Sequence, residues 1–139
     1  KKLKKNKSND IECFNLALSK NNTLLKLVNS KDSSNILGFK TQAKNQKTTV
    51  KAVKLDKFIN YNIQFIKIDV EGAEIQLLEG AKKILKKFKP NLAISVYHKH
   101  NDILEIYNFI DSLNVFKKHK LYFKHYGRNY TDTIMYWYK

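Results

Sequence analysis

The sequence of 139 residues has little of what several common kinds of protein require. Cys13 is its single cysteine, which excludes an internal disulfide and a cysteine-rich metal site, so a reducing cytoplasm is the expected compartment. No apolar run approaches the roughly 18 residues of a membrane span. The basic start at residues 1–7 is followed by polar residues where a signal peptide needs an apolar stretch. With a hydrophobic fraction of 42%, the chain is expected to be a globular domain.

Arginine is almost absent, although positive charge is plentiful. The chain has 27 basic and 12 acidic residues, a net charge of +15, and Arg128 is its only arginine. Phosphates and guanine edges favour the bidentate guanidinium group, and the lysines are spread over the whole length. We therefore interpret the charge as a solvated basic surface. An anionic substrate or a membrane surface could also use it.

The first sixty residues combine polar segments with short apolar runs, and their pattern is irregular. The segment 23–29 alternates only loosely around its leucines. The expected elements are the polar end of a helix at 1–8, a strand at 11–18, a surface loop at 30–46 with a short strand near Ile36, a strand at 48–54 and a helical turn at 55–59.

From residue 61 the pattern is regular and predicts a βαβαββ core. We expect strands at 63–70 and 91–97, helices at 72–88 and from Asn101 or Asp102 onward, and a closing hairpin of strands 121–126 and 133–138 around a turn at 127–129.

This order of elements predicts the α/β class. Strands that alternate with helices imply right-handed crossovers and a mostly parallel sheet, to which the hairpin adds one antiparallel strand. The second helix is expected to turn Leu104, Tyr107, Ile110 and Leu113 inward. The whole chain, 1–139, is expected to be a single domain.

The segment IKIDVEGAE places two carboxylates where a strand ends and a helix begins. Ligands of open α/β sheets bind at the carboxyl ends of the strands, and Gly72 lets the backbone turn tightly there. Asp69 and Glu71 can accept hydrogen bonds from an ammonium group, hold a cation or take a proton from a hydroxyl. Glu74 is assigned to the helix dipole, and Lys67 to an ion pair with a nearby carboxylate.

A long segment around this motif resembles the FkbM family of methyltransferases. The run FIKIDVEGAEIQLLEGAKKILKKFKPNLAISVYHKHNDILEI is similar to the family's core, and KLYFKHYGRNYTDTIMY is similar to its closing hairpin. NLALS at 15–19 and VKAVKLDKFI fit an earlier strand and turn, so nearly all of the chain is covered. The resemblance implies a class I methyltransferase (Rossmann-like) fold with S-adenosylmethionine as cofactor. Its acceptor is an oxygen of a sugar, glycolipid or small molecule, and Ala17, Leu18 and Asp69 are the expected cofactor contacts.

Methyl transfer to oxygen needs an aligned acceptor and a group that removes its proton. His98 follows the strand 91–97 at the same sheet edge as Asp69 and Glu71. Imidazole has an ordinary pKa of about 6.5, so His98 is the first candidate for a general base. Alternatively, these three residues bind a divalent cation that orients the acceptor. His125 is a second candidate but is expected to be a hydrogen-bonded or core residue, and His100 and His119 are expected at the surface.

Glycine is scarce where this family needs it. Gly38, Gly72, Gly80 and Gly127 are too far apart to form the G-x-G turn that opens such a cofactor site. The only methionine is Met135, so we expect a fragment whose first cofactor-binding half precedes Lys1. We expect this fragment to bind the cofactor poorly and to aggregate through an open strand edge.

Two other functions stay open. One is a non-catalytic remnant of the enzyme. The other is a basic nucleic-acid-binding module with stacking aromatic residues, although core packing is the preferred explanation for these side chains, so no specific nucleic-acid partner is expected. They are Tyr122, Phe123, Tyr126, Tyr130 and Tyr136.

Overall fold

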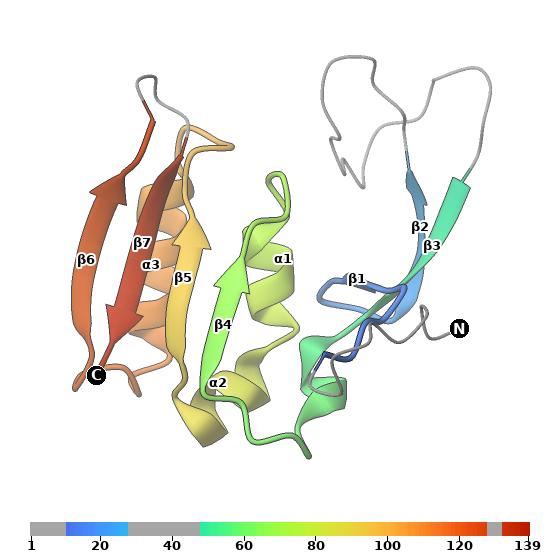
Figure 1. Ribbon diagram of the computed structural model, residues 1–139, viewed down its shortest axis with the longest axis horizontal. Helices are drawn as coiled ribbons and strands as arrows, with labels where there is room; N and C mark the ends of the chain where they lie inside the picture. Colours follow the sequence, from blue (N-terminus) through green and yellow to red (C-terminus); the bar gives the residue numbers. More distant parts are fainter. Residues whose placement is uncertain (1–10, 28–47, 128–131) are drawn as a thin grey trace.

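The computed structural model describes residues 11–27, 48–127 and 132–139, whose strands form two sheets (Figure 1). The predicted helix end at 1–8, the short strand near Ile36 and the turn residues 128 and 129 lie outside this part. The elements are β1 (Ala17–Leu18), β2 (Thr23–Leu27), β3 (Thr48–Val53), a 3-10 helix (Leu55–Phe58), β4 (Phe65–Ile68), α1 (Glu74–Glu79), α2 (Lys82–Phe88), β5 (Asn91–Ser95), α3 (Asp102–Ser112), β6 (Lys120–His125) and β7 (Thr133–Tyr138).

The first sheet has the order β1-β3-β2, with β1 parallel and β2 antiparallel to β3. β1 is much shorter than the predicted strand at 11–18. Ile11 and Phe14 are exposed, and only Ala17 and Leu18 pair with β3. β2 forms where the sequence showed only loose alternation. Leu18 packs against the core of the second sheet, so the two sheets share apolar contacts.

The second sheet has the order β4-β5-β7-β6 and contains the main core. Ile68, Ile94 and Met135 are neighbours in register, and all three are almost fully buried. Ile106 and Ile110 of α3 join the same cluster, and Figure 1 shows α3 behind this sheet. Apolar residues at every second strand position therefore fix one face of the sheet under the helices.

The chain is of the mixed α/β kind, but the expected mostly parallel sheet is only partly confirmed. β1–β3 and β4–β5 are parallel pairs, whereas β2–β3, β5–β7 and β6–β7 are antiparallel. The predicted closing hairpin is present, and β7 inserts between β5 and β6. Within the described residues, β4 lies at an edge of its sheet.

The helix predicted at 72–88 is divided into α1 and α2 at Gly80 and Ala81. A Cβ at Gly80 would overlap the carbonyl oxygen of Ser19, so only glycine permits this close approach. The break also exposes the first N–H groups of α2. The carboxylate of Asp56 accepts two of them, from Lys83 at 3.1 Å and Ile84 at 2.9 Å. A residue distant in sequence therefore caps α2.

The predicted inner face of α3 was partly wrong. Ile110 and Leu113 are buried as expected, but Leu104 is 65% exposed and Tyr107 is 42% exposed. The helix begins with Asp102 turned inward, where its Oδ2 accepts the N–H of Lys99 at 2.7 Å. This contact rotates the helix so that Asp102, Ile106 and Ile110 share the buried face.

Core packing was also the wrong explanation for several aromatic residues of the hairpin. Tyr122, Phe123 and Tyr126 are exposed by 44%, 52% and 55%, and Tyr130 lies outside the described residues. The hydroxyl groups of Tyr126 and Tyr136 are hydrogen-bonded to each other at 2.8 Å. In the part of the chain that the structure describes, no helix is long and apolar enough to cross a membrane.

Candidate active site

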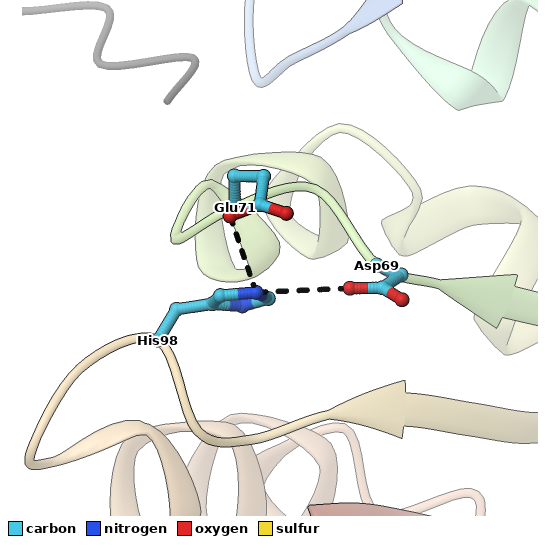
Figure 2. Close-up of side chains that lie close together, drawn as sticks. All are labelled: Asp69, Glu71 and His98. Carbon is cyan, nitrogen blue, oxygen red and sulfur yellow. Dashed lines mark ion pairs between the residues drawn. The ribbon is translucent and has the colours of Figure 1, made fainter. Parts of the chain in front are cut away.

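Three of the residues singled out in the sequence meet at one edge of the second sheet (Figure 2). Asp69 directly follows β4, Glu71 lies in the turn before α1, and His98 follows β5. Because β4 and β5 are parallel neighbours, their carboxyl ends lie side by side, and the segments that follow them meet. The local order of strand, turn and helix therefore assembles the cluster.

The ring of His98 points at both carboxylates (Figure 2). Its Nε2 lies 3.7 Å from Oδ1 of Asp69 and 3.6 Å from Oε2 of Glu71. The His98 side chain is only 9% exposed, whereas those of Asp69 and Glu71 are 36% and 37% exposed. The cluster is thus closed behind the imidazole and open to solvent at the carboxylates.

A left-handed turn aims Glu71 at the histidine. Glu71 has a φ of 52° and Gly72 a φ of 90°, and the second value is one that glycine adopts without strain. A Cβ at Gly72 would also lie 3.2 Å from Cε of Lys99, which is closer than usual. The positive φ is therefore the reason that glycine is needed after the carboxylate, because the flexible end of Lys99 can shift to admit a methyl group.

The remaining carboxylate of the motif, Glu74, is buried and holds the histidine from behind. It is 1% exposed, and its Oε1 lies 2.9 Å from Nδ1 of His98. The same oxygen accepts the N–H groups of Val70 and Gly72 at 3.2 and 3.3 Å. A carboxylate can only accept these bonds, so Nδ1 donates, and the lone pair of Nε2 is turned toward the cluster.

Sequence reasoning missed this role of Glu74. Glu74 lies in the first turn of α1, where its negative charge complements the helix dipole as predicted. One signal could have identified it: Leu77 and Leu78, three and four residues later, are buried apolar residues on the same helical face. A carboxylate on the apolar face of a helix needs a polar partner inside the fold.

The lysine predicted to form an ion pair does so. Nζ of Lys67 lies 3.2 Å from Oδ2 of Asp69, which leaves the other oxygen of this carboxylate turned to His98. Lys99 places its Nζ on the carbonyl oxygen of Gly72. Two lysine ammonium groups therefore lie beside the cluster. One contacts a single oxygen of Asp69 and the other a backbone carbonyl, so neither contacts the oxygens that face His98.

Comparison with known proteins gives one family. The family model described as the methyltransferase FkbM domain matches residues 1–128. The chain belongs to the FkbM methyltransferase family. It is also similar to the crystal structure of methyltransferase FkbM from Methylobacillus flagellatus KT, with 33% identity and a TM-score of 0.59. That match covers 65% of this chain and 24% of the solved chain, so this chain spans about a quarter of its relative. No curated protein matches it.

In this FkbM-family chain, the raised pKa values of Tyr97 and Asp102 show how the surroundings of the cluster affect charge. Burial, followed by the negative charge of Asp69, raises the pKa of Tyr97, whose ring lies 4.2 Å from that of His98. Burial is also the main cause that raises the pKa of Asp102, against the opposing hydrogen bond from Lys99. The surroundings of His98 thus favour neutral or positively charged groups over further negative charge.

The other histidines lie elsewhere in the chain. Nδ1 of His125 is hydrogen-bonded to the hydroxyl of Thr133 at 2.9 Å, and His100 is exposed. His119, expected at the surface, is partly buried with Nε2 3.1 Å from the carbonyl oxygen of Lys89, and its burial lowers its pKa. None of these three belongs to the candidate metal-ligand groups among the described residues.

The expected cofactor contacts lie in two different sheets. Ala17 and Leu18 form β1 of the first sheet, whereas Asp69 follows β4 of the second. Leu18 packs against the core of the second sheet. A cofactor contact by Ala17 and Leu18 stays a prediction from the family resemblance.

Proposed function

We propose that this chain carries the acceptor side of an S-adenosylmethionine-dependent O-methyltransferase. Membership of the FkbM family supports methyl transfer as the reaction. The observation that carries the proposal is the cluster of Asp69, Glu71 and His98 at the carboxyl edge of β4 and β5, where α/β enzymes bind their ligands. The acceptor is a hydroxyl of a sugar, glycolipid or small molecule.

The residues present fit part of the proposed cofactor. The carboxylate of Asp69 is 36% exposed and offers an acceptor for the cofactor's ammonium group, and the turn at Gly72 lets a ligand approach the backbone. The sequence has no glycine-rich turn to complete such a site. When bound, S-adenosylmethionine supplies an electrophilic methyl group.

The chain's own residues would orient the acceptor hydroxyl and assist the removal of its proton. The open side of the cluster presents Asp69 and Glu71, which can accept hydrogen bonds from an acceptor hydroxyl. Two chemistries of proton removal fit. Either Nε2 of His98 would take the proton directly, or the three residues would hold a divalent cation that lowers the pKa of the acceptor hydroxyl, whose proton would then pass to solvent.

Charge bears on where the acceptor is presented. The net charge of +15 favours attachment to an anionic membrane surface, whereas the acceptor group that reaches Asp69 and Glu71 is expected to be a neutral hydroxyl. The nucleic-acid alternative has less support, because Tyr126 and Tyr136 are bonded to each other and Tyr122 stacks on Tyr138 at 5.0 Å. Binding of single strands with a steep salt dependence would favour this alternative.

A methyl-transfer assay tests the proposal. The longest form of the protein that its coding sequence encodes is incubated with methyl-labelled S-adenosylmethionine and a panel of neutral sugars, acidic sugars, glycolipids and phenols. We expect label in an O-methyl ether of at least one acceptor, and transfer that falls when the acceptor hydroxyl is blocked. Transfer only to nitrogen or carbon, or no transfer to any acceptor, contradicts the proposal.

A further inference from the structure

The unsatisfied ring nitrogen of His98 is the least explained atom of the cluster. Its side chain is 9% exposed, and Nε2 has no hydrogen-bond partner among the described residues. With Nδ1 engaged by Glu74, the lone pair of Nε2 faces two carboxylates at 3.6 and 3.7 Å. Three electron-rich atoms that face one another are stable together only when a positive charge lies between them.

We propose that Asp69, Glu71 and His98 bind one divalent cation of the Mg²⁺ and Mn²⁺ class. One oxygen of each carboxylate and Nε2 are its protein ligands. The role of this cation in catalysis rests on the proposed function, whereas the binding itself does not. The two carboxylates suit hard divalent ions, and the single imidazole favours Mn²⁺ over Mg²⁺ among them.

The distances from Nε2 of His98 to the two carboxylates suit a single ion. The atoms offered by Asp69, Glu71 and His98 all lie within 4.8 Å of one another. Two ligands of one ion lie at most twice the metal–ligand distance apart, which is about 4 Å for Mg²⁺ and about 5 Å for Ca²⁺. The distances of 3.6 and 3.7 Å from Nε2 fall inside both limits.

The support behind the histidine is the kind that metal sites use. A histidine ligand usually donates its second N–H to a carboxylate, which fixes the ring and its tautomer. Glu74 makes this contact at 2.9 Å from a buried position. The N–H groups of Val70 and Gly72 hold Glu74 in turn, so one turn of backbone positions both Glu71 and the support of His98.

The lysine beside Asp69 leaves the proposed metal site open to a cation. Lys67 binds Oδ2 of Asp69, whereas Oδ1 faces His98 and stays available to an ion. The second candidate group, formed by Glu74, His98 and Asp102, is less suitable. Both of its carboxylates are 1% exposed, and Oε1 of Glu74 and Oδ2 of Asp102 already accept backbone N–H groups.

The site is tested by titrating the longest form of the protein that its coding sequence encodes with Mn²⁺ alone. Binding is measured by calorimetry and by the loss of the free-ion electron paramagnetic resonance signal. We expect one Mn²⁺ per chain, and at least a tenfold loss of affinity in each of the variants Asp69→Asn and His98→Ala. Glu74→Gln is expected to weaken binding about 10- to 100-fold. His100→Ala is the matched control, because His100 is a nearby exposed histidine, and it is expected to bind as the wild type does.

Circular dichroism is used to check whether each variant is folded, and Asp69→Asn keeps the test decisive if His98→Ala unfolds. Failure of the wild type to bind Mn²⁺, or equal binding by wild type and Asp69→Asn, overturns the site. The titration contains neither cofactor nor acceptor, so it tests the binding site independently of the reaction. If Mn²⁺ binds but the separate methyl-transfer assay fails, the result counts against the proposed function alone. Methyl transfer that persists in a chelator contradicts the role of the cation in catalysis and leaves its binding to be decided by the titration.

Discussion

Nδ1 of His98 lies 2.9 Å from Oε1 of Glu74, so a buried carboxylate at the start of α1 fixes the ring of a histidine that follows β5. This contact joins two segments that are separated by 24 residues. It also determines which ring nitrogen faces Asp69 and Glu71. The fold and the chemistry of the cluster therefore depend on the same side chain.

Replacement of Glu74 by alanine is expected to destabilise the fold. It removes the acceptor of two backbone N–H groups and of Nδ1 of His98, and each buried donor left unsatisfied costs about 1–3 kcal/mol. Urea unfolding gives the change in the free energy of unfolding. Glu79→Ala is the control, because Glu79 lies on the same helix with a 3.8 Å surface ion pair, and a change below about 0.5 kcal/mol is expected. Equal effects of the two substitutions contradict the structural role.

The cap that Asp56 provides predicts a second loss of stability. Asp56→Ala leaves the N–H groups of Lys83 and Ile84 without their acceptor, and loss of a cap costs about 1 kcal/mol. Asp111→Ala, on the exposed side of α3, serves as the control in the same thermal unfolding experiment. A wild-type melting temperature for Asp56→Ala means that α2 does not need this cap.

Gly80→Ala separates local propensity from tertiary packing. Helix propensity alone predicts a gain of about 1 kcal/mol for this substitution. The structure predicts the opposite sign, because the added methyl group meets the backbone of Ser19, and such overpacking costs about 1–3 kcal/mol. Chemical unfolding measures the sign directly. A more stable variant shows that the backbone of Ser19 does not approach Gly80 as closely as described.

Asp102 predicts a specific pH dependence. Its pKa is raised mainly by burial, so between the ordinary and the raised value the folded chain binds more protons than the unfolded chain. Wild-type stability therefore falls as the pH rises through this window. Asp102→Asn cannot ionise and keeps an oxygen for the N–H of Lys99. Unfolding experiments across the acid range are expected to show that the free energy of unfolding of the variant increases relative to that of the wild type as the pH rises. A decrease relative to the wild type as the pH rises contradicts the raised pKa.

Periodicity was enough to predict the elements that form the site. The strands around Ile68 and Ile94 and the helices after them follow from apolar patterns, and the parallel crossover brings Asp69, Glu71 and His98 to one edge. These are short-range patterns combined with a general rule of topology. They need no knowledge of individual long-range contacts.

The features that the sequence did not reveal depend on contacts between distant residues. The break at Gly80 needs the approach of Ser19, and the cap on α2 comes from Asp56, 27 residues before Lys83. A continuous helical pattern contains neither fact. The inward position of Asp102 likewise changes which residues of α3 are buried, because a polar partner in the preceding loop outweighs the apolar pattern.

The central claim is that Asp69, Glu71 and His98 form one ligand-binding site whose shape Glu74 maintains. Crystals of the chain grown with Mn²⁺, with an anomalous difference map recorded at the manganese edge, test it most directly. The account predicts one strong peak bounded by Nε2 of His98 and one oxygen each of Asp69 and Glu71, with Nδ1 still on Glu74. A map with no peak there, and with Nε2 bonded only to water, contradicts the claim.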